Sequence, residues 1–280
     1  MSGSRGRVLG VCADDVGLVD GVAQSVVALA AAGRLSAASC VTNGPHWGAA
    51  AALLASSRPP IDLGLHFNLS EGVPLSAALR AHWPTLPGLA ALLARAHLRA
   101  LPLAAIGAEL AAQVDAFAAA LGRAPDFVDG HQHVHALPGV RGIVLDAVVA
   151  WPRAPWVRST GRVLGPGTAF KRWVIEASGG RALERDLVAR GVAHNRALLG
   201  AYDFAADYRP LMQAWLAEAP ADGGLLFCHP RSDAGATSDP IAAARIREAA
   251  YLASDEFRAD LAAADVTVGA TWATRSSSAG

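Results

Sequence analysis

Four groups of polar side chains in this sequence of 280 residues could do chemistry, and each of them follows a short apolar run. The groups are Asp14-Asp15, His66, the segment FVDGHQHVH with Asp129, His131, His133 and His135, and His229. One aspartate and two histidines that leave positions open for water form a catalytic metal site, which lowers the pKa of water towards ~7 and polarises a carbonyl. A nearby carboxylate can accept a proton, and an imidazole can protonate a departing amine. Hydrolysis of an amide bond needs all of these groups.

The paired carboxylates and the isolated histidines each have a structural alternative. Asp14 and Asp15 repel each other unless a positive group lies near, and taken alone they fit a helix N-cap or a solvated turn. In the functional interpretation one is a metal ligand and the other a general base, brought into one pocket by the turn that ends the strand. A lone histidine such as His66 or His229 is more often structural than a ligand. A functional role for these two histidines is favoured only because each follows a predicted strand, as the other polar groups do.

The three histidines of FVDGHQHVH are spaced by two, so in a strand they would share one face. Burying three imidazoles on one face is costly unless they serve a metal, although they could also lie in a solvated loop. We expect His131, the deepest in the predicted strand, to be a ligand. His133 and His135 are expected to line the pocket or to support the ligands from behind.

Short apolar runs alternate with helical stretches along the whole chain. We predict strands at 7–13, 36–41, 61–67, 127–134, 156–158, 224–228 and 266–268. Helices are predicted at 20–32, 46–56, 104–121, 140–149 and 240–252, from 254 onwards, and in a helix-rich stretch at 169–218. This alternation predicts an α/β fold, a distorted single-domain (β/α) TIM-like barrel with parallel strands, over residues 1–274. In such a barrel the four polar groups meet at the C-terminal ends of the strands. The Ser-rich residues 275–280 are expected to be a disordered tail.

The segment 68–102 differs from the rest because it carries four prolines with interspersed glycines. It is too long for an ordinary connection, so we expect a partly helical excursion over one face of the barrel. Trp83 within it is a candidate for stacking on a sugar ring, and a buried aromatic is an equal alternative.

Composition restricts the partners of the protein. The formal net charge is +0 and there is no block of Lys or Arg, which argues against nucleic acid and anionic membrane surfaces as partners. No apolar run reaches the ~20 residues that span a bilayer, and the N-terminus lacks the features of a signal peptide. Cys12, Cys40 and Cys228 share no metal-type spacing and fit small buried side chains in a reducing compartment. We therefore expect a cytoplasmic protein without a transmembrane segment. No motif sets its oligomeric state, for which a homodimer is the working expectation.

The sequence resembles the YdjC-like carbohydrate deacetylases, also called the ChbG/HpnK family. The resemblance is carried by VCADDVGLVDGV, LSAASCVTNGP, DLGLHFNLSEGVPL, APDFVDGHQHVHALPGV and LLFCHPRSD, which occur in the family's order from about residue 8 to residue 233. It implies a distorted (β/α) barrel and one divalent metal ion held by one Asp and two His. It also implies removal of N-acetyl groups from amino sugars, so the expected partner is an N-acetylated sugar, in a free oligosaccharide or a glycolipid headgroup.

The resemblance also suggests individual roles. It implies that Asp15, His66 and His131 hold the metal and that Asp14 is the general base. A mixed Asp/His site suits Mg or Zn as the first candidates, with Mn, Ni or Co as alternatives. His229 is the candidate general acid, and Asp129 could orient a ligand. In this chain Val16 stands where the family more often has Phe, and HPRSD replaces HPG. We expect Arg231 of that motif to pair with Asp233; contact with an acidic or phosphorylated substrate is the alternative.

Two other functions compete with deacetylation. Metal phosphoesterases and cyclic amidohydrolases are also barrels with HxH pairs, but they usually carry the pair on the first strand, and here it comes mid-chain. The carbamylated lysine of an amidohydrolase would have to be Lys171, the only lysine, which lies outside any predicted strand. The second alternative is a non-catalytic sugar-binding barrel, which metal-dependent turnover would exclude.

Overall fold

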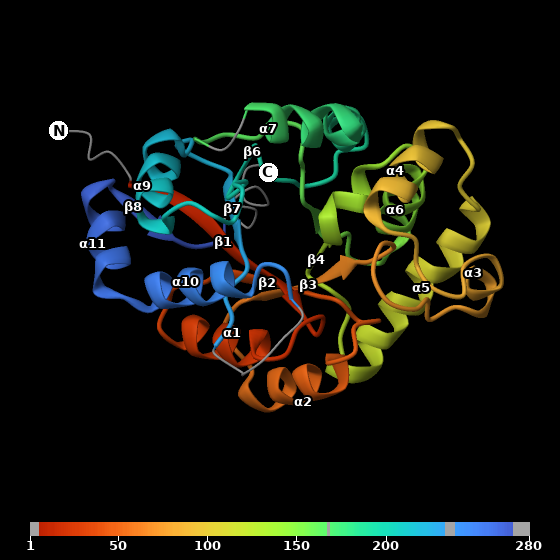
Figure 1. Cartoon of the computed structure of the whole chain (residues 1–280), viewed down its shortest axis with the longest axis horizontal. Helices are drawn as coiled ribbons and strands as arrows, with labels where there is room; N and C mark the ends of the chain where they lie inside the picture. The colour runs from red at the N-terminus through yellow and green to blue at the C-terminus, as the bar shows by residue number, and fades with distance from the viewer. Residues whose placement is uncertain (1–5, 167–168, 233–238, 271–280) are drawn as a thin grey trace.

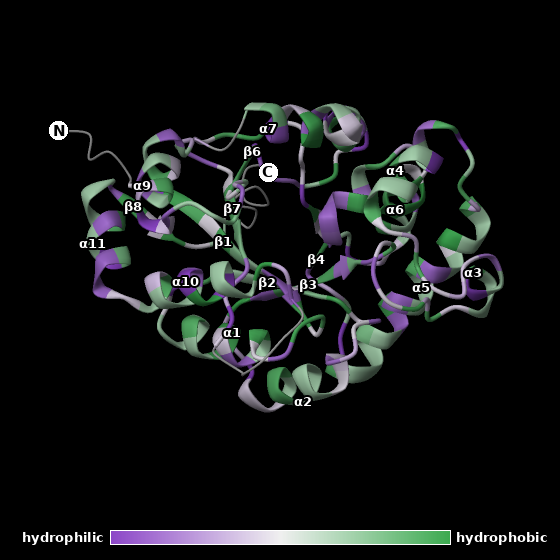
Figure 2. Cartoon of the chain, viewed as in Figure 1, coloured by the Kyte–Doolittle hydropathy of each residue, from purple (hydrophilic) through white to green (hydrophobic). Residues whose placement is uncertain are grey.

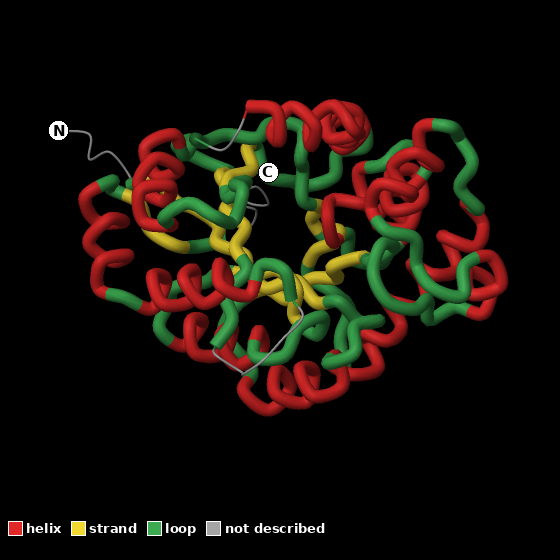
Figure 3. The backbone as a smooth tube through the Cα atoms, viewed as in Figure 1, coloured by secondary structure: helices red, strands yellow, loops and turns green. Residues whose placement is uncertain are grey.

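The computed structural model describes residues 6–166, 169–232 and 239–270. Its strands lie at the centre and its helices around them (Figures 1 and 3). The strands are β1 (Arg7–Val16), β2 (Ala37–Cys40), β3 (Asp62–Phe67), β4 (Phe127–Gly130), β5 (Trp156–Val157), β6 (Ala197–Leu199), β7 (Gly224–Cys228) and β8 (Val266–Val268). All the pairings between them are parallel, in the order β5-β4-β3-β2-β1-β7-β6, and β8 pairs with β1.

The helices follow the strands in alternation, as predicted. They are α1 (Val22–Ala31), α2 (Trp47–Ser57), α3 (Ala77–His82), α4 (Leu89–His97), α5 (Leu103–Leu121), α6 (Val140–Ala150), α7 (Ala169–Ile175), α8 (Arg181–Ala189), α9 (Tyr208–Glu218), α10 (Ala242–Ala253) and α11 (Asp255–Ala263). A 3-10 helix, η1 (His131–Ala136), follows β4, and a π-helical turn, η2 (Glu176–Gly180), joins α7 to α8. The expected tail at 275–280 lies outside the described residues.

The sheet curls into an incomplete barrel, which confirms the predicted distorted TIM-like fold. Between β5 and β6 the ring continues through isolated parallel bridges, Val157 to His194 and Val163 to Leu198, in place of regular strand pairing. β6 falls inside the stretch 169–218, where we had expected helices. This three-residue strand is too short to show a period of two among the surrounding helical residues.

Alternation along the strands sorts the side chains into two faces. Leu9, Val11 and Ala13 of β1 belong to the core under the outer helices, whereas Cys12 belongs to the core inside the ring. That inner core also contains Phe127 and Trp156, whose rings stack with centroids 4.2 Å apart. Apolar residues dominate β1 and β7, while the outer helices mix apolar and polar residues (Figure 2). Apolar side chains thus fill the barrel beneath the site. The next inward-pointing positions, towards the C-terminal ends of the strands, carry the polar groups.

The segment 68–102 contains α3 and α4, which confirms a partly helical excursion. Its start is fixed by α5, whose buried Glu109 accepts hydrogen bonds from the backbone N–H groups of Leu75 (2.9 Å) and Ser76 (2.7 Å). Gln113 of α5 likewise bonds the backbone of Asn68. By length and composition alone α5 could cross a membrane. It packs instead on β3, α2, α3 and α6 and buries these two polar side chains, as a core helix does.

Candidate functional site

The two carboxylates at the end of β1 enter the same pocket because the strand is irregular there. The pairing of β1 with β2 shifts register between Ala13 and Val16, and Asp15 has a left-handed backbone with φ of 67°. A bulge of this kind re-aims a side chain that would otherwise point to the opposite face. Asp14 lies two residues after Cys12 and therefore points inward like it. Asp15 turns inward beside Asp14, so both carboxylates are buried in the pocket wall.

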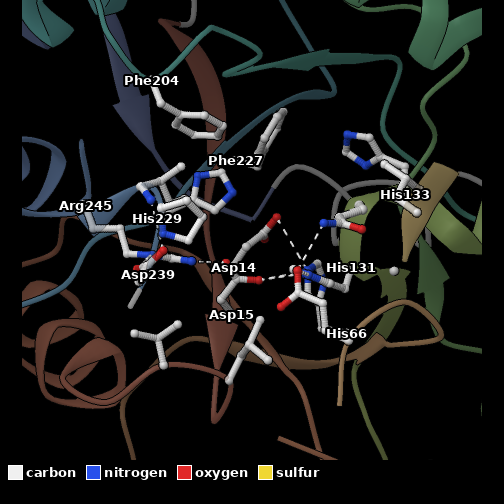
Figure 4. Close-up of a pocket in the computed structure, with 18 of the residues that line it drawn as sticks. Asp14, Asp15, His66, His131, His133, Phe204, Phe227, His229, Asp239 and Arg245 are labelled. Carbon is white, nitrogen blue, oxygen red and sulfur yellow. Dashed lines mark hydrogen bonds and ion pairs between the residues drawn. The ribbon is translucent and has the colours of Figure 1, made fainter. Parts of the chain in front are cut away.

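Asp15, His66 and His131 converge from β1, β3 and the start of η1 (Figure 4). Asp15 Oδ1 lies 2.9 Å from His131 Nδ1 and 3.5 Å from His66 Nε2. One ligand atom from each of the three residues lies within 4.8 Å of the others, and all three residues are buried. A carboxylate oxygen and two imidazole nitrogens are a donor set that suits a divalent cation. The three side chains can therefore hold a metal ion.

The electrostatics of this group favour a bound cation. Burial by itself lowers the pKa of an imidazole, but Asp129 and Asp14 outweigh burial and raise the pKa of His66 to about 10. Asp15 similarly raises the pKa of His131 to about 8 against the effect of burial. Burial by itself raises the pKa of Asp15, and Arg245 and His131 reverse that shift and lower it. The pocket thus attracts positive charge, whether a proton or a metal ion supplies it.

Asp129 and Ser39 fix the orientation of His66. Asp129 Oδ1 lies 2.6 Å from His66 Nδ1, and Ser39 Oγ lies 2.9 Å from the same nitrogen and donates a hydrogen bond to Asp129. With Nδ1 held on this side, Nε2 points to Asp15. A carboxylate behind a histidine in this way sets the ring's orientation and tautomer for a metal.

Arg158 is a central residue of the site that the sequence analysis did not identify. It is fully buried, its Nη1 and Nη2 lie 2.7 and 2.6 Å from the two oxygens of Asp14, and Nη2 lies 2.6 Å from Asp129 Oδ2. Cys12, Asp14 and Asp129 also lie close enough together to bind a metal, but this guanidinium contacts all three of them. Arg158 directly follows β5, so the rule that polar groups at strand ends form the site could have found it.

The expectation that His131, His133 and His135 share one strand face is wrong. β4 ends at Gly130, and the chain turns into η1 with positive φ at Gln132 (52°) and His133 (61°). Gly130 allows this turn, because a Cβ there would lie 2.8 Å from the backbone N of His135. The three imidazoles consequently point to three different places.

Of the three histidines, only His131 joins Asp15 and His66 in the candidate metal-binding set, called the ligand group below. His133 lies edge-on to Phe227, with ring centroids 5.5 Å apart, and lines the cavity. His135 is fully buried, and its Nε2 lies 2.8 Å from the carbonyl oxygen of Arg158. Burial lowers the pKa of His135 to about 4, so the neutral ring donates this hydrogen bond and supports the backbone that carries Arg158.

Two further residues contact the ligand group, and neither of them lies at the end of a strand. Arg245 of α10 places Nη2 2.6 Å from Asp15 Oδ2, and its Nε lies 2.6 Å from Asp239 Oδ2. Glu71, in the loop after β3, places Oε1 3.1 Å from His131 Nε2. Neither has a sequence signal of its own, because Arg245 lies within a helix and Glu71 in a loop.

His229 follows β7 and lies across the carboxylates from His66 and His131 (Figure 4). Its ring packs edge-on against Phe204 and Phe227, with centroids 5.3 and 5.6 Å away. Its backbone N–H donates to the buried Glu248, whose other oxygen accepts from Tyr202. Nδ1 of the ring is buried 3.9 Å from Glu248 Oε1 and has no hydrogen-bond partner among the described residues, so packing holds the imidazole at the wall of the cavity.

The candidate metal ligands and the side chains around them line one cavity of about 890 Å³, whereas Arg158, Asp129 and His135 lie behind its wall. Its walls include Asp14, Asp15, His66, His131, His133, His229, Arg231 and Arg245. The excursion contributes Leu89 and Leu93, but Trp83 is not among the residues that line the cavity. Trp83 is partly buried against the core formed with α4 to α6, and Arg95 lies over its ring. Trp83 is therefore a partly buried aromatic that packs on this core.

Comparison with known proteins identifies the family of the chain. The family model described as "YdjC-like protein" matches residues 8–263, which is most of the chain. The chain belongs to this family. Every candidate site residue named from the sequence lies within the matched range.

Individual relatives cover less of the chain. It is 36% identical over 171 residues to a carbohydrate deacetylase of Homo sapiens, covering 58% of this chain and 52% of the relative. It is also 36% identical over 145 residues to a chitooligosaccharide deacetylase of Salmonella schwarzengrund, covering 49% and 54%. The chain thus spans about half the length of these curated relatives. A crystal structure of a proposed cellobiose-phosphate cleavage protein of Enterococcus faecalis V583 shares the fold, with a TM-score of 0.74, 18% identity and coverage of 96% and 98%.

Proposed function

We propose that the protein is a metal-dependent hydrolase that removes the acetyl group from the nitrogen of an N-acetylated amino sugar. The observation that carries this proposal is the convergence of Asp15, His66 and His131 beside Asp14 at the wall of a large cavity. Membership of the YdjC-like family supports it, as do the relatives named carbohydrate and chitooligosaccharide deacetylase.

In this proposal, activation of the water and protonation of the amine would take place on two sides of the cavity. Asp15, His66 and His131 would hold one divalent cation, with Zn or Mg as the first candidates and Mn, Ni and Co beside them. When bound, the cation would polarise the acetyl carbonyl and make water a stronger nucleophile at neutral pH. Asp14 Oδ2 lies 3.9 Å from His66 Nε2, so its carboxylate borders the ligand group and can accept a proton from the attacking water.

His229 would make the second proton transfer. It faces the ligand group from the opposite side of the carboxylates, where the departing sugar nitrogen would lie if the acetyl group points towards His66 and His131 (Figure 4). Phe204 and Phe227 hold its ring at the cavity wall with Nδ1 buried towards Glu248, so the other ring nitrogen, Nε2, would protonate the amine. Arg158 keeps Asp14 in position through both carboxylate oxygens.

An acetate-release assay over a panel of N-acetylated sugars tests the proposal. We expect release from at least one sugar, loss of release after chelation, and recovery when metal is added back. Asp14→Asn should abolish release while bound metal, measured by elemental analysis, stays nearly intact, and His66→Ala should lose both. Asp146→Asn is the matched control, because Asp146 is an exposed carboxylate paired with Arg190 far along the chain. Full activity of Asp14→Asn would refute its role as base, and full activity of protein verified as metal-free would refute metal dependence.

A further inference from the structure

Glu248 of α10 is a fully buried carboxylate that has no part in the proposed reaction. Its Oε1 accepts a hydrogen bond from the hydroxyl of Tyr202, and its Oε2 accepts one from the backbone N–H of His229. Burial and the neighbouring Glu248 raise the pKa of the Tyr202 hydroxyl, so this hydroxyl stays protonated and donates. Two donors thus hold the carboxylate in one orientation beside His229.

The ring of His229 supplies the group that this carboxylate lacks. Its Nδ1 is buried without a hydrogen-bond partner and lies 3.9 Å from Glu248 Oε1, which is within ion-pair distance. In the parts of the chain that the structure describes, no Arg or Lys forms a salt bridge with Glu248. A buried anion without a cation and a buried ring nitrogen without a partner are both costly, and protonation of the ring satisfies both.

With Nδ1 held towards Glu248, the second ring nitrogen, Nε2, is left for the cavity that His229 lines. A carboxylate behind a histidine in this way sets its orientation and tautomer and stabilises its positive form. The next charged residue along the chain, Arg231, also lines the cavity, and Asp233, expected to pair with it, lies outside the described residues. Glu248 is therefore the carboxylate that the structure places behind His229.

α10 connects this pair to the ligand group. Arg245 lies one turn before Glu248 on the helix, and its Nη2 lies 2.6 Å from Asp15 Oδ2. The same helix thus contacts Asp15 through Arg245 and His229 through Glu248. It sets the distance between the ligand group and the candidate general acid.

We propose that Glu248 is the positioning residue of the general acid, which keeps a proton on Nδ1 of His229 and stabilises the protonated ring, so that Nε2 protonates the sugar nitrogen. This inference rests on the proposed deacetylase function and gives a role to a residue outside the cavity lining. Water forms the new bond to the acetyl carbon and gives a proton to Asp14. The C–N bond breaks with its electron pair on nitrogen, which takes the Nε2 proton of His229. The ring is left neutral with its proton on Nδ1, and the proton on Asp14 returns to Nε2 through solvent.

The test compares two kinds of acetyl donor that differ in their need for an acid. The amine released from an N-acetylated sugar needs a proton, whereas the 4-nitrophenolate released from 4-nitrophenyl acetate leaves without one. The sugars are N-acetylglucosamine and N,N′-diacetylchitobiose, and chelated enzyme is the blank for every rate. We expect Glu248→Gln to lower kcat for the sugar by about 10- to 100-fold, with KM and the hydrolysis of the ester nearly unchanged. His229→Gln should lower the ratio of sugar to ester hydrolysis at least as far.

Tyr202→Phe should lower this ratio by less than Glu248→Gln does, because the carboxylate loses one of the two donors that fix it. Tyr208→Phe is its matched control, since the Tyr208 ring lies against Tyr202, with centroids 5.7 Å apart, but its hydroxyl has no hydrogen-bond partner among the described residues. Glu109→Gln is the control for Glu248, because Glu109 is equally buried and also accepts backbone N–H groups. Both controls should leave the ratio unchanged.

Thermal melts of each variant establish that it is folded. An equal loss with sugar and ester in Glu248→Gln is what a purely structural role gives, and it would overturn the proposal. Unchanged rates with both donors would also overturn it.

NMR of protein labelled with nitrogen-15 histidine separates this inference from the proposed function. With the His229 signals assigned through His229→Gln, we expect the neutral wild-type ring to carry its proton on Nδ1, and Glu248→Gln to lose this preference. That result without acetate release from any sugar would support Glu248 as the partner of His229 and refute deacetylation. Acetate release with an unchanged ratio in Glu248→Gln would refute the positioning role and leave deacetylation standing.

Discussion

Replacing Arg158 by Met tests whether this one guanidinium holds the site together. The side chain is fully buried and makes three contacts of 2.6 to 2.7 Å with Asp14 and Asp129, so its loss removes the guanidinium that these two buried carboxylates share and leaves them both facing His66. Breaking a buried ion pair by removing one partner costs ~3–5 kcal/mol, and here one cation serves two anions, so we expect a value towards the upper end. For a protein of this size the melting temperature should fall by roughly 10 °C.

Urea denaturation followed by circular dichroism measures the free energy of unfolding, and acetate release measures the effect on Asp14. We expect activity to fall by about 100-fold, because a catalytic group that moves by about 1 Å loses that much. Arg141→Met is the control, since the Arg141–Asp186 pair is partly exposed and should contribute less than ~1 kcal/mol. In a double-mutant cycle, Arg158→Met and Asp14→Asn should not be additive. A loss of under about 1 kcal/mol for Arg158→Met, or simple additivity with Asp14→Asn, would refute this account of the site.

Three other predictions concern stability. Zinc should raise the melting temperature of the wild type but not of Asp15→Ala, measured by a thermal melt with and without chelator, and equal shifts in the two would argue against the ligand group. Glu109→Ala should cost ~2–4 kcal/mol, because the N–H groups of Leu75 and Ser76 lose their acceptor, and hydrogen exchange should quicken at these two amides before others. His135 has a pKa near 4 when folded and ~6.5 when unfolded, so the unfolded state binds more protons between these values and stability falls as pH drops from about 6.5 to 4. The wild type should lose ~3 kcal/mol more over this range than His135→Gln, and parallel losses in urea titrations would contradict the buried neutral ring.

The sequence alone determined the fold class and most of the polar groups of the site. Apolar runs such as 7–13 and 61–67 alternate with helical stretches, and this pattern depends only on local periodicity, which the printed sequence contains in full. Because parallel strands present their C-terminal ends on one edge, Asp15, His66 and His131 could be assigned to a common place before any coordinates were known.

Tertiary structure decided what each of these groups touches. A strand prediction put His131, His133 and His135 on one face, but the chain turns after Gly130, and the turn brings His135 into contact with the backbone of Arg158, 23 residues away. Arg245, which lies within a helix, reaches Asp15 across 230 residues of sequence. Whether a buried charge is balanced depends on such distant partners, because electrostatic interactions act through space and local sequence patterns do not record them.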